Sequence, residues 1–254
     1  MILRHASRTL IVIPARLGST RLPAKVLKPL AGVPVVEWVR RAALKADCGK
    51  VVVAVDHAGV AEAVRRQGGW AVMTSTRCAS GSDRVAEAAR AVEGGGPRFR
   101  WVINLQGDEP FIRPATIRAV LSRLTGADRP RADIATAVVP LPPGGARDPN
   151  VVKAVVGRDG RCLYFSRSPV PFARDGNGLP LLQHIGIYGY RRDALDRFVR
   201  LPPSPLERCE QREQLRALEA GMTIAAARVR DRSLSIDTQA DLRRAVRLCR
   251  GLKP

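Results

Sequence analysis

Thr9-Leu-Ile-Val-Ile13 is a short run of apolar and β-branched residues, and it leads directly into the loop Pro14-Ala-Arg-Leu-Gly-Ser-Thr-Arg-Leu-Pro-Ala-Lys25. An apolar run of this length, followed by loop-forming residues, predicts a strand buried on both faces of a parallel sheet. Ligands of such sheets bind beyond the carboxyl ends of the strands. The loop after Ile13 is therefore the first candidate for a binding site.

This loop has the composition of an anion-binding segment. Cations can pair with phosphate oxygens, a glycine lets the backbone approach an anion, and hydroxyl groups add hydrogen-bond donors. The loop is neither a Walker A motif nor a GxGxxG fingerprint, and the alternative is a basic surface loop without a ligand. The residues expected to bind phosphate are Arg16, Gly18, Ser19, Thr20, Arg21 and Lys25.

Apolar runs and helical patterns alternate through the first half of the chain. This alternation predicts an α/β fold with an open, mostly parallel, Rossmann-like sheet and helices on both faces. The expected helices are Val35 to Ala46, Ala58 to Gln67 and Asp83 to Val92, and the expected strands after the first are Lys50 to Val55, Trp70 to Thr74 and Trp101 to Leu105.

The second half of the chain is less regular. We expect one domain over residues 1–254, with a dimerisation arm at about 140–200, because no linker composition interrupts the chain. Thr238 is a good N-cap for the last helix. The expected strands are Ile134 to Pro140, Val151 to Val156 and Gly186 to Tyr190, and the expected helices are Glu207 to Ala220 and Gln239 to Arg250.

The composition limits the class of protein. The formal charge is +20, from 43 Lys and Arg against 23 Asp and Glu, but these residues are spread along the chain and only 4% of residues are aromatic. Nucleic-acid binding is therefore possible but not favoured, because a base-stacking surface needs aromatic side chains. The five cysteines form no CxxC pair, which favours reduced thiols. No stretch has the pattern of a signal peptide or the length of a membrane span, so we expect a cytoplasmic protein without a membrane partner.

Two carboxylates occupy positions suited to a metal ion. Asp108 follows the apolar run Trp101 to Leu105 within Gln106-Gly-Asp-Glu-Pro110, and Asp237 ends the short segment Ser235-Ile-Asp. Oxygen ligands at strand ends suit Mg²⁺, which usually also binds substrate phosphates. Each aspartate alone also fits a capping role at a turn or a helix start. Together they predict a shared metal site formed by distant parts of the chain.

The polar residues of the second half carry weaker signals. His184 begins a segment rich in small residues, and a single histidine is more often structural than catalytic. Glu213 and Gln214 lie on an otherwise basic helix pattern, where ion pairs on a solvated face are the simplest interpretation.

An ordered set of motifs resembles the 3-deoxy-manno-octulosonate (Kdo) cytidylyltransferases over nearly the whole chain. Single tetrapeptides would be weak evidence, but these motifs occur in the order found in that family. They are Ile13-Pro-Ala-Arg16, Ser19-Thr-Arg-Leu-Pro23 with Lys25, Asp56-His57, Ser80-Gly-Ser-Asp-Arg84, Asn104-Leu-Gln-Gly-Asp-Glu-Pro110, Val152-Lys153, Tyr164-Phe-Ser-Arg167, His184-Ile-Gly-Ile-Tyr-Gly-Tyr190, Pro203-Ser-Pro-Leu-Glu207, Glu213-Gln-Leu-Arg216 and Asp237-Thr238.

The resemblance implies a fold, a reaction and a set of residues. The fold would be of the nucleotide-diphospho-sugar transferase type, in a homodimer with an exchanged arm. CTP would bind with Mg²⁺, the anomeric hydroxyl of a 2-keto-3-deoxy sugar acid would attack the α-phosphate, and pyrophosphate would leave, as in lipopolysaccharide biosynthesis. Arg16, Lys25, Asp108 and Asp237 would be catalytic, with Asp108 and Asp237 as metal ligands; Pro14, Ala15, Arg16, Gly18, Ser19, Arg21, Lys25, Ser80, Arg84 and Gln106 would bind the nucleotide; Gln106, Arg167, His184, Tyr188, Glu213 and Gln214 would bind the sugar acid.

The chain departs from the family pattern at three places, one of which is a short loop before Gln183. Ala24 stands where the family usually has glycine, and Arg77-Cys-Ala79 replaces Asp-His-Gln before Ser80. The acceptor therefore stays open between Kdo and a relative such as a nonulosonate or 8-amino-Kdo. A non-catalytic nucleic-acid-binding protein is the alternative from a different class.

Overall fold

The computed structural model describes residues 2–19, 21–126, 131–141, 144–174, 180–230 and 232–249. Thr20, one of the two predicted hydroxyl donors of the loop, lies outside them. The chain forms two compact units: unit 1 comprises Met1–Arg118 and Ser233–Pro254, and unit 2 comprises Ala119–Arg232. The chain passes from unit 1 to unit 2 within helix α4 (Pro114–Thr125).

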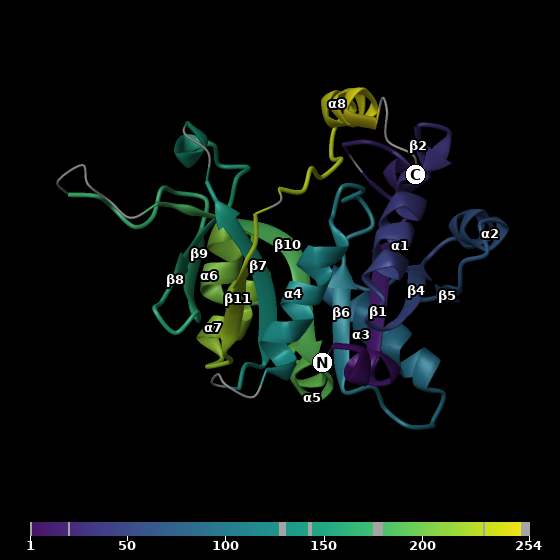
Figure 1. Ribbon diagram of the computed structural model, residues 1–254, viewed down its shortest axis with the longest axis horizontal. Helices are drawn as coiled ribbons and strands as arrows, with labels where there is room; N and C mark the ends of the chain where they lie inside the picture. Colours follow the sequence, from purple (N-terminus) through teal and green to yellow (C-terminus); the bar gives the residue numbers. More distant parts are fainter. Residues whose placement is uncertain are drawn as a thin grey trace. The chain divides into compact units, whose positions relative to one another are not determined.

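Unit 1 is built on a parallel sheet with β1 (Thr9–Ala15) in its interior (Figure 1). Strand β1 pairs in parallel with β6 (Trp101–Leu105) on one side and with β4 (Lys50–Val55) on the other. Strand β4 also pairs in parallel with β5 (Ala71–Met73). The order β6-β1-β4-β5 confirms the predicted parallel sheet.

The helices of unit 1 cover both faces of this sheet. Helix α1 (Val35–Ala46) connects β1 to β4, and α2 (Ala58–Arg66) connects β4 to β5 in the same direction. Helix α3 (Gly81–Glu93) then leads back across the sheet to β6. Because parallel crossovers are right-handed, this reversal places α1 and α2 on one face and α3 on the other. The carboxyl ends of β1 and β6, on either side of the reversal, are where such sheets bind ligands.

A hydrophobic cluster within unit 1 joins the C-terminal segment to the region around the basic loop. Its buried residues come from the loop, from the small ribbon β2 (Pro29–Leu30) and β3 (Val33–Pro34), from α1 and from the segment that ends in α8 (Gln239–Cys249). Burial of such side chains contributes roughly 1.5–3 kcal/mol each. The buried members are Leu22, Leu30, Val35, Trp38, Ile236, Leu242, Ala245 and Cys249.

Unit 2 has a mixed sheet. Strand β7 (Ile134–Pro140) pairs in parallel with β11 (Ile224–Arg228) and antiparallel with β10 (Leu182–Arg191). Strand β8 (Lys153–Val156) pairs antiparallel with β10 and with β9 (Cys162–Ser166). The helices of this unit are short: α5 (Arg192–Phe198), α6 (Pro205–Glu210) and α7 (Gln214–Glu219).

The structure corrects one predicted helix and extends the pattern. The single helix expected over Glu207 to Ala220 is wrong, because the chain turns at Gln211, whose φ of 53° is left-handed, and α6 and α7 are separate. Helix α4 and strands β9 and β11 were not predicted. The N-cap of the last helix is confirmed by a hydrogen bond from Asp241 N to Thr238 Oγ1 at 3.2 Å. That helix ends at Cys249, and Arg250 lies outside the described residues.

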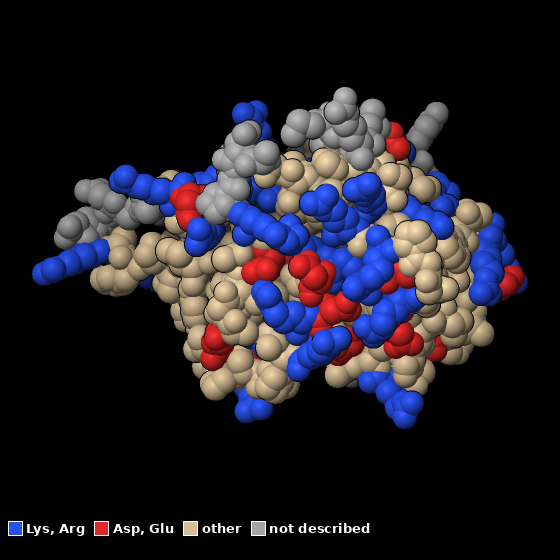
Figure 2. Space-filling view, turned by 90° about the horizontal axis from the view of Figure 1, so that it is seen from below, with Lys and Arg blue, Asp and Glu red and all other residues tan. Residues whose placement is uncertain are grey.

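Three expectations from composition can be compared with the structure. All five cysteines are free thiols, as predicted. Within the described residues, no helix has both the length and the apolar character required to cross a membrane. On the face shown in Figure 2, Asp and Glu side chains lie directly among the Lys and Arg side chains.

Candidate active site

A lysine and two aspartates from distant parts of the sequence meet in unit 1. Lys25 Nζ donates a hydrogen bond to Asp108 Oδ2 and another, of 2.8 Å, to Asp237 Oδ1. Burial of Lys25 favours the neutral amine, but Asp108 and Asp237 together outweigh this effect and raise its pKa above the ordinary value. The predicted convergence of the two carboxylates is therefore observed, with an ammonium group between them.

The C-terminal segment brings Asp237 to this point. Ile236 is fully buried in the unit 1 cluster, and its backbone N–H donates to the carbonyl of Asp108 at 2.9 Å. Asp237 N and Thr238 N both donate to Asp241 Oδ2, so the start of α8 is fixed as well. A backbone hydrogen bond and a buried isoleucine thus place the second carboxylate next to the first.

A glycine allows the two strand-end loops to meet. A Cβ atom added to Gly107 would lie 2.8 Å from the carbonyl oxygen of Pro14, closer than such contacts occur. Only glycine permits this approach without a shift of the backbone. The loop after β6 therefore lies against the start of the basic loop after β1.

The remaining residues of the basic loop are more exposed. Arg21 Nη2 pairs with Asp237 Oδ1 at 3.1 Å, with the arginine side chain 63% exposed. Arg16 and Gly18 are exposed and Ser19 is partly exposed. Within the described residues Arg16 makes no ion pair, so its guanidinium can meet a phosphate without first breaking one. Pro14 and Ala15 form the last two residues of β1.

The basic loop is hydrogen-bonded to Asp56, which also forms an ion pair with the buried Arg84. Asp56 Oδ1 accepts a hydrogen bond from Leu17 N at 3.0 Å, and Asp56 Oδ2 pairs with Arg84 Nη2 at 3.0 Å. Arg84 is only 4% exposed and also donates to Thr74 Oγ1 at 2.6 Å. Arg84 thus acts on the loop through Asp56 in this structure. Ser80, the other residue expected here, caps α3 by accepting from Asp83 N at 3.1 Å.

Two further polar residues lie beside the paired aspartates. Glu109 is buried, and its Oε2 has no hydrogen-bond partner among the described residues. Burial, and to a smaller extent the neighbouring Asp108 carboxylate, raises the pKa of Glu109 to about 7. Gln106 Nε2 donates to Asn104 Oδ1 at 3.2 Å at the end of β6.

In unit 2, His184 and Tyr188 lie close together on β10. Their ring centroids are 5.4 Å apart, across an irregularity in the pairing of β10 with β7. Burial of His184, with a contribution from Arg212, lowers the pKa of its imidazole to about 3. Burial, with Tyr190 and Glu213, raises the pKa of Tyr188 well above the ordinary value. Both side chains are therefore neutral near pH 7.

The hydrogen bonds of Thr136 assign the tautomer of His184. Thr136 Oγ1 lies 2.8 Å from the carbonyl of Ile187 and 2.9 Å from His184 Nε2. A hydroxyl has one proton, and a carbonyl oxygen this close can only accept it. The hydroxyl therefore accepts from Nε2–H, which leaves the lone pair of a neutral imidazole on Nδ1. His184 can thus accept a hydrogen bond from a substrate hydroxyl.

The other residues predicted to bind the sugar acid lie around the short helices of unit 2. Gln214 is 5% exposed, and its Nε2 has no hydrogen-bond partner among the described residues. Glu213 accepts from Arg216 Nη2 at 3.4 Å. Arg167 directly follows β9 and donates from Nη1 to the carbonyl of Pro149 at 2.7 Å. Gln106 belongs to unit 1.

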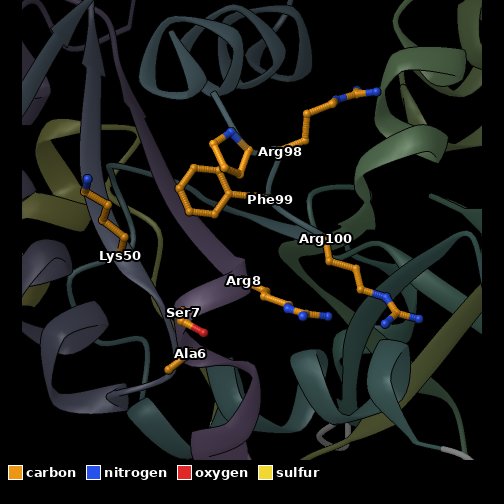
Figure 3. Close-up of a pocket in the computed structure, with 8 residues that line it drawn as sticks. Ala6, Ser7, Arg8, Lys50, Arg98, Phe99 and Arg100 are labelled. Carbon is orange, nitrogen blue, oxygen red and sulfur yellow. The ribbon is translucent and has the colours of Figure 1, made fainter. Parts of the chain in front are cut away.

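The cavity drawn in Figure 3 lies at the end of the unit 1 sheet opposite to Lys25, Asp108 and Asp237. It has a volume of about 740 Å³ and is lined by residues that include Arg8, Lys50, Arg98 and Arg100. Arg8 and Arg100 precede β1 and β6, and Lys50 begins β4, so the cavity lies at the amino ends of the strands. In Figure 3 the ends of Lys50, Arg98 and Arg100 point in different directions. We therefore assign no ligand to it.

Comparison with known proteins gives the family. A model of the family described as Cytidylyltransferase matches residues 10–224. A 3-deoxy-manno-octulosonate cytidylyltransferase of Rhodospirillum centenum is 52% identical over 93% of this chain and 91% of its own. The chain belongs to this family. The enzyme of the same description from Elusimicrobium minutum is 47% identical over 96% of this chain and 98% of its own.

A solved structure gives the same answer for the fold. The structure described as CMP:2-keto-3-deoxy-manno-octonic acid synthetase complexed with CTP has a TM-score of 0.88 and 39% sequence identity. It covers 96% of this chain and 99% of the other. The present enzyme is therefore a nucleotidyltransferase with the α/β fold predicted from its sequence.

Three residues that organise these sites were assigned no role from the sequence, although Asp56 and Glu109 lie in motifs of the family resemblance. Asp56 and Thr136 hold the basic loop and His184, respectively, and Glu109 lies buried beside the paired aspartates. Asp56 is the first residue after the apolar strand β4, and Asp108 follows β6 by three residues. The position of Asp56 could therefore have been used to predict a role at the sheet end. For Thr136 no local signal exists, because its role depends on contacts with distant residues.

Replacing Ala24 with glycine should stabilise the enzyme. Ala24 precedes Lys25 and has a left-handed backbone with a φ of 51°, which explains why glycine is usual at this position in the family. Relief of this strain, less the extra entropy of glycine in the unfolded chain, should raise the free energy of unfolding by roughly 0.5–1 kcal/mol. Urea unfolding of wild type and A24G measures the difference, and a less stable variant would contradict the assignment.

Asp56→Ala should be strongly destabilising. It leaves the buried Arg84 guanidinium without its carboxylate and Leu17 N without its acceptor, so we expect a loss of about 3 kcal/mol in the free energy of unfolding. Glu62→Ala is the matched control, because Glu62 pairs with Arg66 at 2.8 Å with both side chains more than half exposed. That variant should lose less than about 0.5 kcal/mol. Equal losses in urea unfolding would show that the Asp56 pair is not structural.

The pKa of His184 predicts an acid-sensitive fold. The unfolded chain binds a proton near pH 6.5, whereas folded His184 binds one only near pH 3. This contribution to stability is therefore complete above pH 6.5 and is lost as the pH falls toward 3. Thermal melts of wild type and His184→Gln between pH 7.5 and 4.5 should diverge as the pH falls, with wild type losing more. Parallel curves would contradict the burial of a neutral His184.

Proposed function

We propose that this enzyme transfers the CMP group of CTP to the anomeric hydroxyl of Kdo and releases pyrophosphate. The observation that carries the proposal is the meeting of Lys25, Asp108 and Asp237 at the carboxyl ends of β1 and β6. The names of the relatives, which are 47–52% identical, support CTP and Kdo as substrates and favour Kdo over a nonulosonate or 8-amino-Kdo. A non-catalytic nucleic-acid-binding role would give no reason for this cluster.

The basic loop suits the triphosphate of CTP. Arg16, Arg21 and Lys25 supply cations, and Gly18 and Ser19 supply backbone and hydroxyl donors. Phosphoryl transfer requires little covalent chemistry from the protein, so positioning and charge neutralisation account for most of the catalysis. The loop would hold the pyrophosphate leaving group while the α-phosphate faces the acceptor.

The carboxylates fit a magnesium ion. Asp108 and Asp237 both reach one ammonium group, so their oxygens lie close enough together to share one cation. No group of three or more His, Cys, Asp or Glu residues suited to a metal occurs within the described part of the chain, so the proposed ion would take its other ligands from substrate phosphates and water. Bound there, Mg²⁺ would neutralise phosphate charge and lower the pKa of the attacking hydroxyl.

The polar residues of unit 2 suit a sugar acid. Arg167 offers a guanidinium for the substrate carboxylate, and Gln214 offers a buried amide whose Nε2 has no partner in the described part of the chain. Neutral His184 offers Nδ1 as an acceptor for a hydroxyl group, and Tyr188 and Glu213 lie beside it. We further propose a cytoplasmic homodimer in lipopolysaccharide biosynthesis. The exposed Leu163 and Phe172 lie in the predicted dimerisation arm and support a second copy, which light scattering of the purified chain would detect.

Pyrophosphate release tests the proposal directly. The enzyme is assayed with Mg²⁺, Kdo and each of CTP, UTP, ATP and GTP, and then with CTP and alternative sugar acids. We expect kcat/KM with CTP and Kdo to exceed every other combination by at least about tenfold. A lack of turnover with any 2-keto sugar acid would reject the proposed function, and a preference for another acid would reject Kdo alone.

A further inference from the structure

Lys153 is a completely buried lysine to which the proposed reaction assigns no role. It is the first residue of β8, and its side chain is one of the largest that are fully buried in the described structure. An ammonium group in such a place is tolerated only when its N–H groups are hydrogen-bonded. Lys153 Nζ donates to three backbone carbonyls: those of Asp148 at 3.0 Å, Val151 at 2.8 Å and Arg167. All three of its donors are therefore used.

These carbonyls belong to two segments that leave the sheet at the same place. Lys153 pairs with Ser166 in the antiparallel register of β8 and β9, and Arg167 is the first residue beyond β9. Residues 148–151 form the turn that enters β8 from the other side. The backbone pairing of β8 with β9 ends there, and beyond it the Lys153 ammonium group connects the two segments through its hydrogen bonds.

Glu210, the last residue of α6, holds Arg167 from its other side. Its Oε2 accepts from the backbone N of Arg167 at 2.9 Å, and its Oε1 accepts from Ser166 Oγ at 2.6 Å. The carbonyl of Glu210 also accepts from Arg167 Nε at 3.1 Å. Charged groups therefore bind Arg167 at both its N–H and its C=O, and such hydrogen bonds are stronger than neutral ones.

The guanidinium of Arg167 is oriented by the same segments. Its Nη1 donates to the carbonyl of Pro149, within the turn that Lys153 holds, and its Nε donates to Glu210. No contact within the described residues uses Nη2. The N–H groups of Nη2 are thus held in a fixed direction and are free to meet a carboxylate.

We propose that Lys153 and Glu210 are positioning residues that hold Arg167 for the carboxylate of the sugar acid. The inference rests on the proposed function, because it takes Arg167 as a ligand of that carboxylate. Neither residue touches the substrate. Replacing either residue should change the orientation of the Arg167 guanidinium. Binding of the sugar acid should then weaken, whereas the affinity for the nucleotide, which is proposed to bind through unit 1, should not change.

Steady-state kinetics of two single variants test this arrangement. In Lys153→Met we expect the KM for Kdo to rise by roughly tenfold or more, and in Glu210→Gln by roughly threefold to tenfold. In both, the KM for CTP should stay within about twofold. Glu210 is partly exposed, so E210Q should fold even if burial makes K153M too unstable to purify. An unchanged KM for Kdo in E210Q, or equal rises for both substrates, would overturn the proposal.

A double variant separates positioning from a general structural effect. If Glu210 acts only through Arg167, then E210Q should change the KM for Kdo by less than about twofold in an Arg167→Ala background. If E210Q raised the KM for Kdo by the same factor in the R167A background as in wild type, the proposal would be overturned. The matched control is Arg192→Met, which removes another buried cation of unit 2 that pairs with Asp196 at 2.5 Å. It should lower the melting temperature and leave both KM values unchanged.

The same assay distinguishes failure of this inference from failure of the proposed function. If the wild-type enzyme does not turn over Kdo, the proposed function fails before any variant is compared. If wild type turns over Kdo and R167A does not raise its KM, then Arg167 is not a carboxylate ligand and the positioning role falls with it.

Discussion

Asp108→Asn should lower kcat for cytidylyl transfer on the order of 10³-fold, which corresponds to about 4 kcal/mol of transition-state stabilisation. The amide keeps the shape of the side chain but removes one of the two carboxylate charges that face Lys25. If the two carboxylates hold Mg²⁺ as proposed, Asp237 alone should bind the ion too weakly to keep it on the triphosphate. Single-turnover rates at saturating CTP and Kdo, with increasing Mg²⁺, measure the loss.

The control for this variant is Asp47→Asn. Asp47 is an exposed carboxylate of the same unit, at the left-handed C-cap of α1, where asparagine is also tolerated. D47N should retain full activity. If D108N retained more than about one tenth of the wild-type kcat, the paired-carboxylate site would not be the catalytic centre.

Lys25→Met should reduce kcat/KM for CTP by roughly 10²–10³-fold, because the basic loop loses one of the cations proposed to bind the triphosphate. It should also lower the stability of the free enzyme by about 2 kcal/mol, since Asp108 and Asp237 then face each other without the ammonium between them. Assays of turnover and urea unfolding measure the two effects. Lys45→Met, at an exposed position on α1, is the control and should change neither quantity.

A magnesium titration makes the Lys25 prediction more specific. In the absence of nucleotide, Lys25 competes with a cation for the two carboxylates. Removing it should open the site, so Mg²⁺ should raise the melting temperature of K25M more than that of wild type. A variant that is destabilised but insensitive to Mg²⁺ would indicate that the carboxylates do not form a cation site.

Local patterns in the sequence predicted the parts of the fold that depend on neighbouring residues. The apolar run Thr9 to Ile13, the helix Val35–Ala46 and the Thr238 cap each carry a complete signal within a few residues. The helix expected over Glu207 to Ala220 failed because Gln211 adopts a left-handed conformation without glycine or proline to mark it. Tertiary contacts decide such a turn, and the sequence alone does not display them.

The same distinction holds for the sites. Some site residues could be predicted because they follow strands or lie in a loop rich in cations, glycine and hydroxyl groups. The structure brings together four of them, Arg21, Lys25, Asp108 and Asp237. Arg84 was predicted to bind the nucleotide, and in this structure its guanidinium is buried against Asp56. Lys153 belongs to the Val152-Lys153 motif of the family resemblance, but the neighbouring residues did not indicate its role, since that role depends on three backbone carbonyls from two separate segments.

The most direct test is the identity of the product. The enzyme is incubated with CTP, Kdo and Mg²⁺, and phosphorus NMR and mass spectrometry follow the nucleotide and the sugar together. We predict that pyrophosphate and a CMP-Kdo phosphodiester linked through the anomeric oxygen form in equal amounts. Pyrophosphate released with free CMP and unchanged Kdo, or no loss of CTP, would contradict the assignment of this site to cytidylyl transfer.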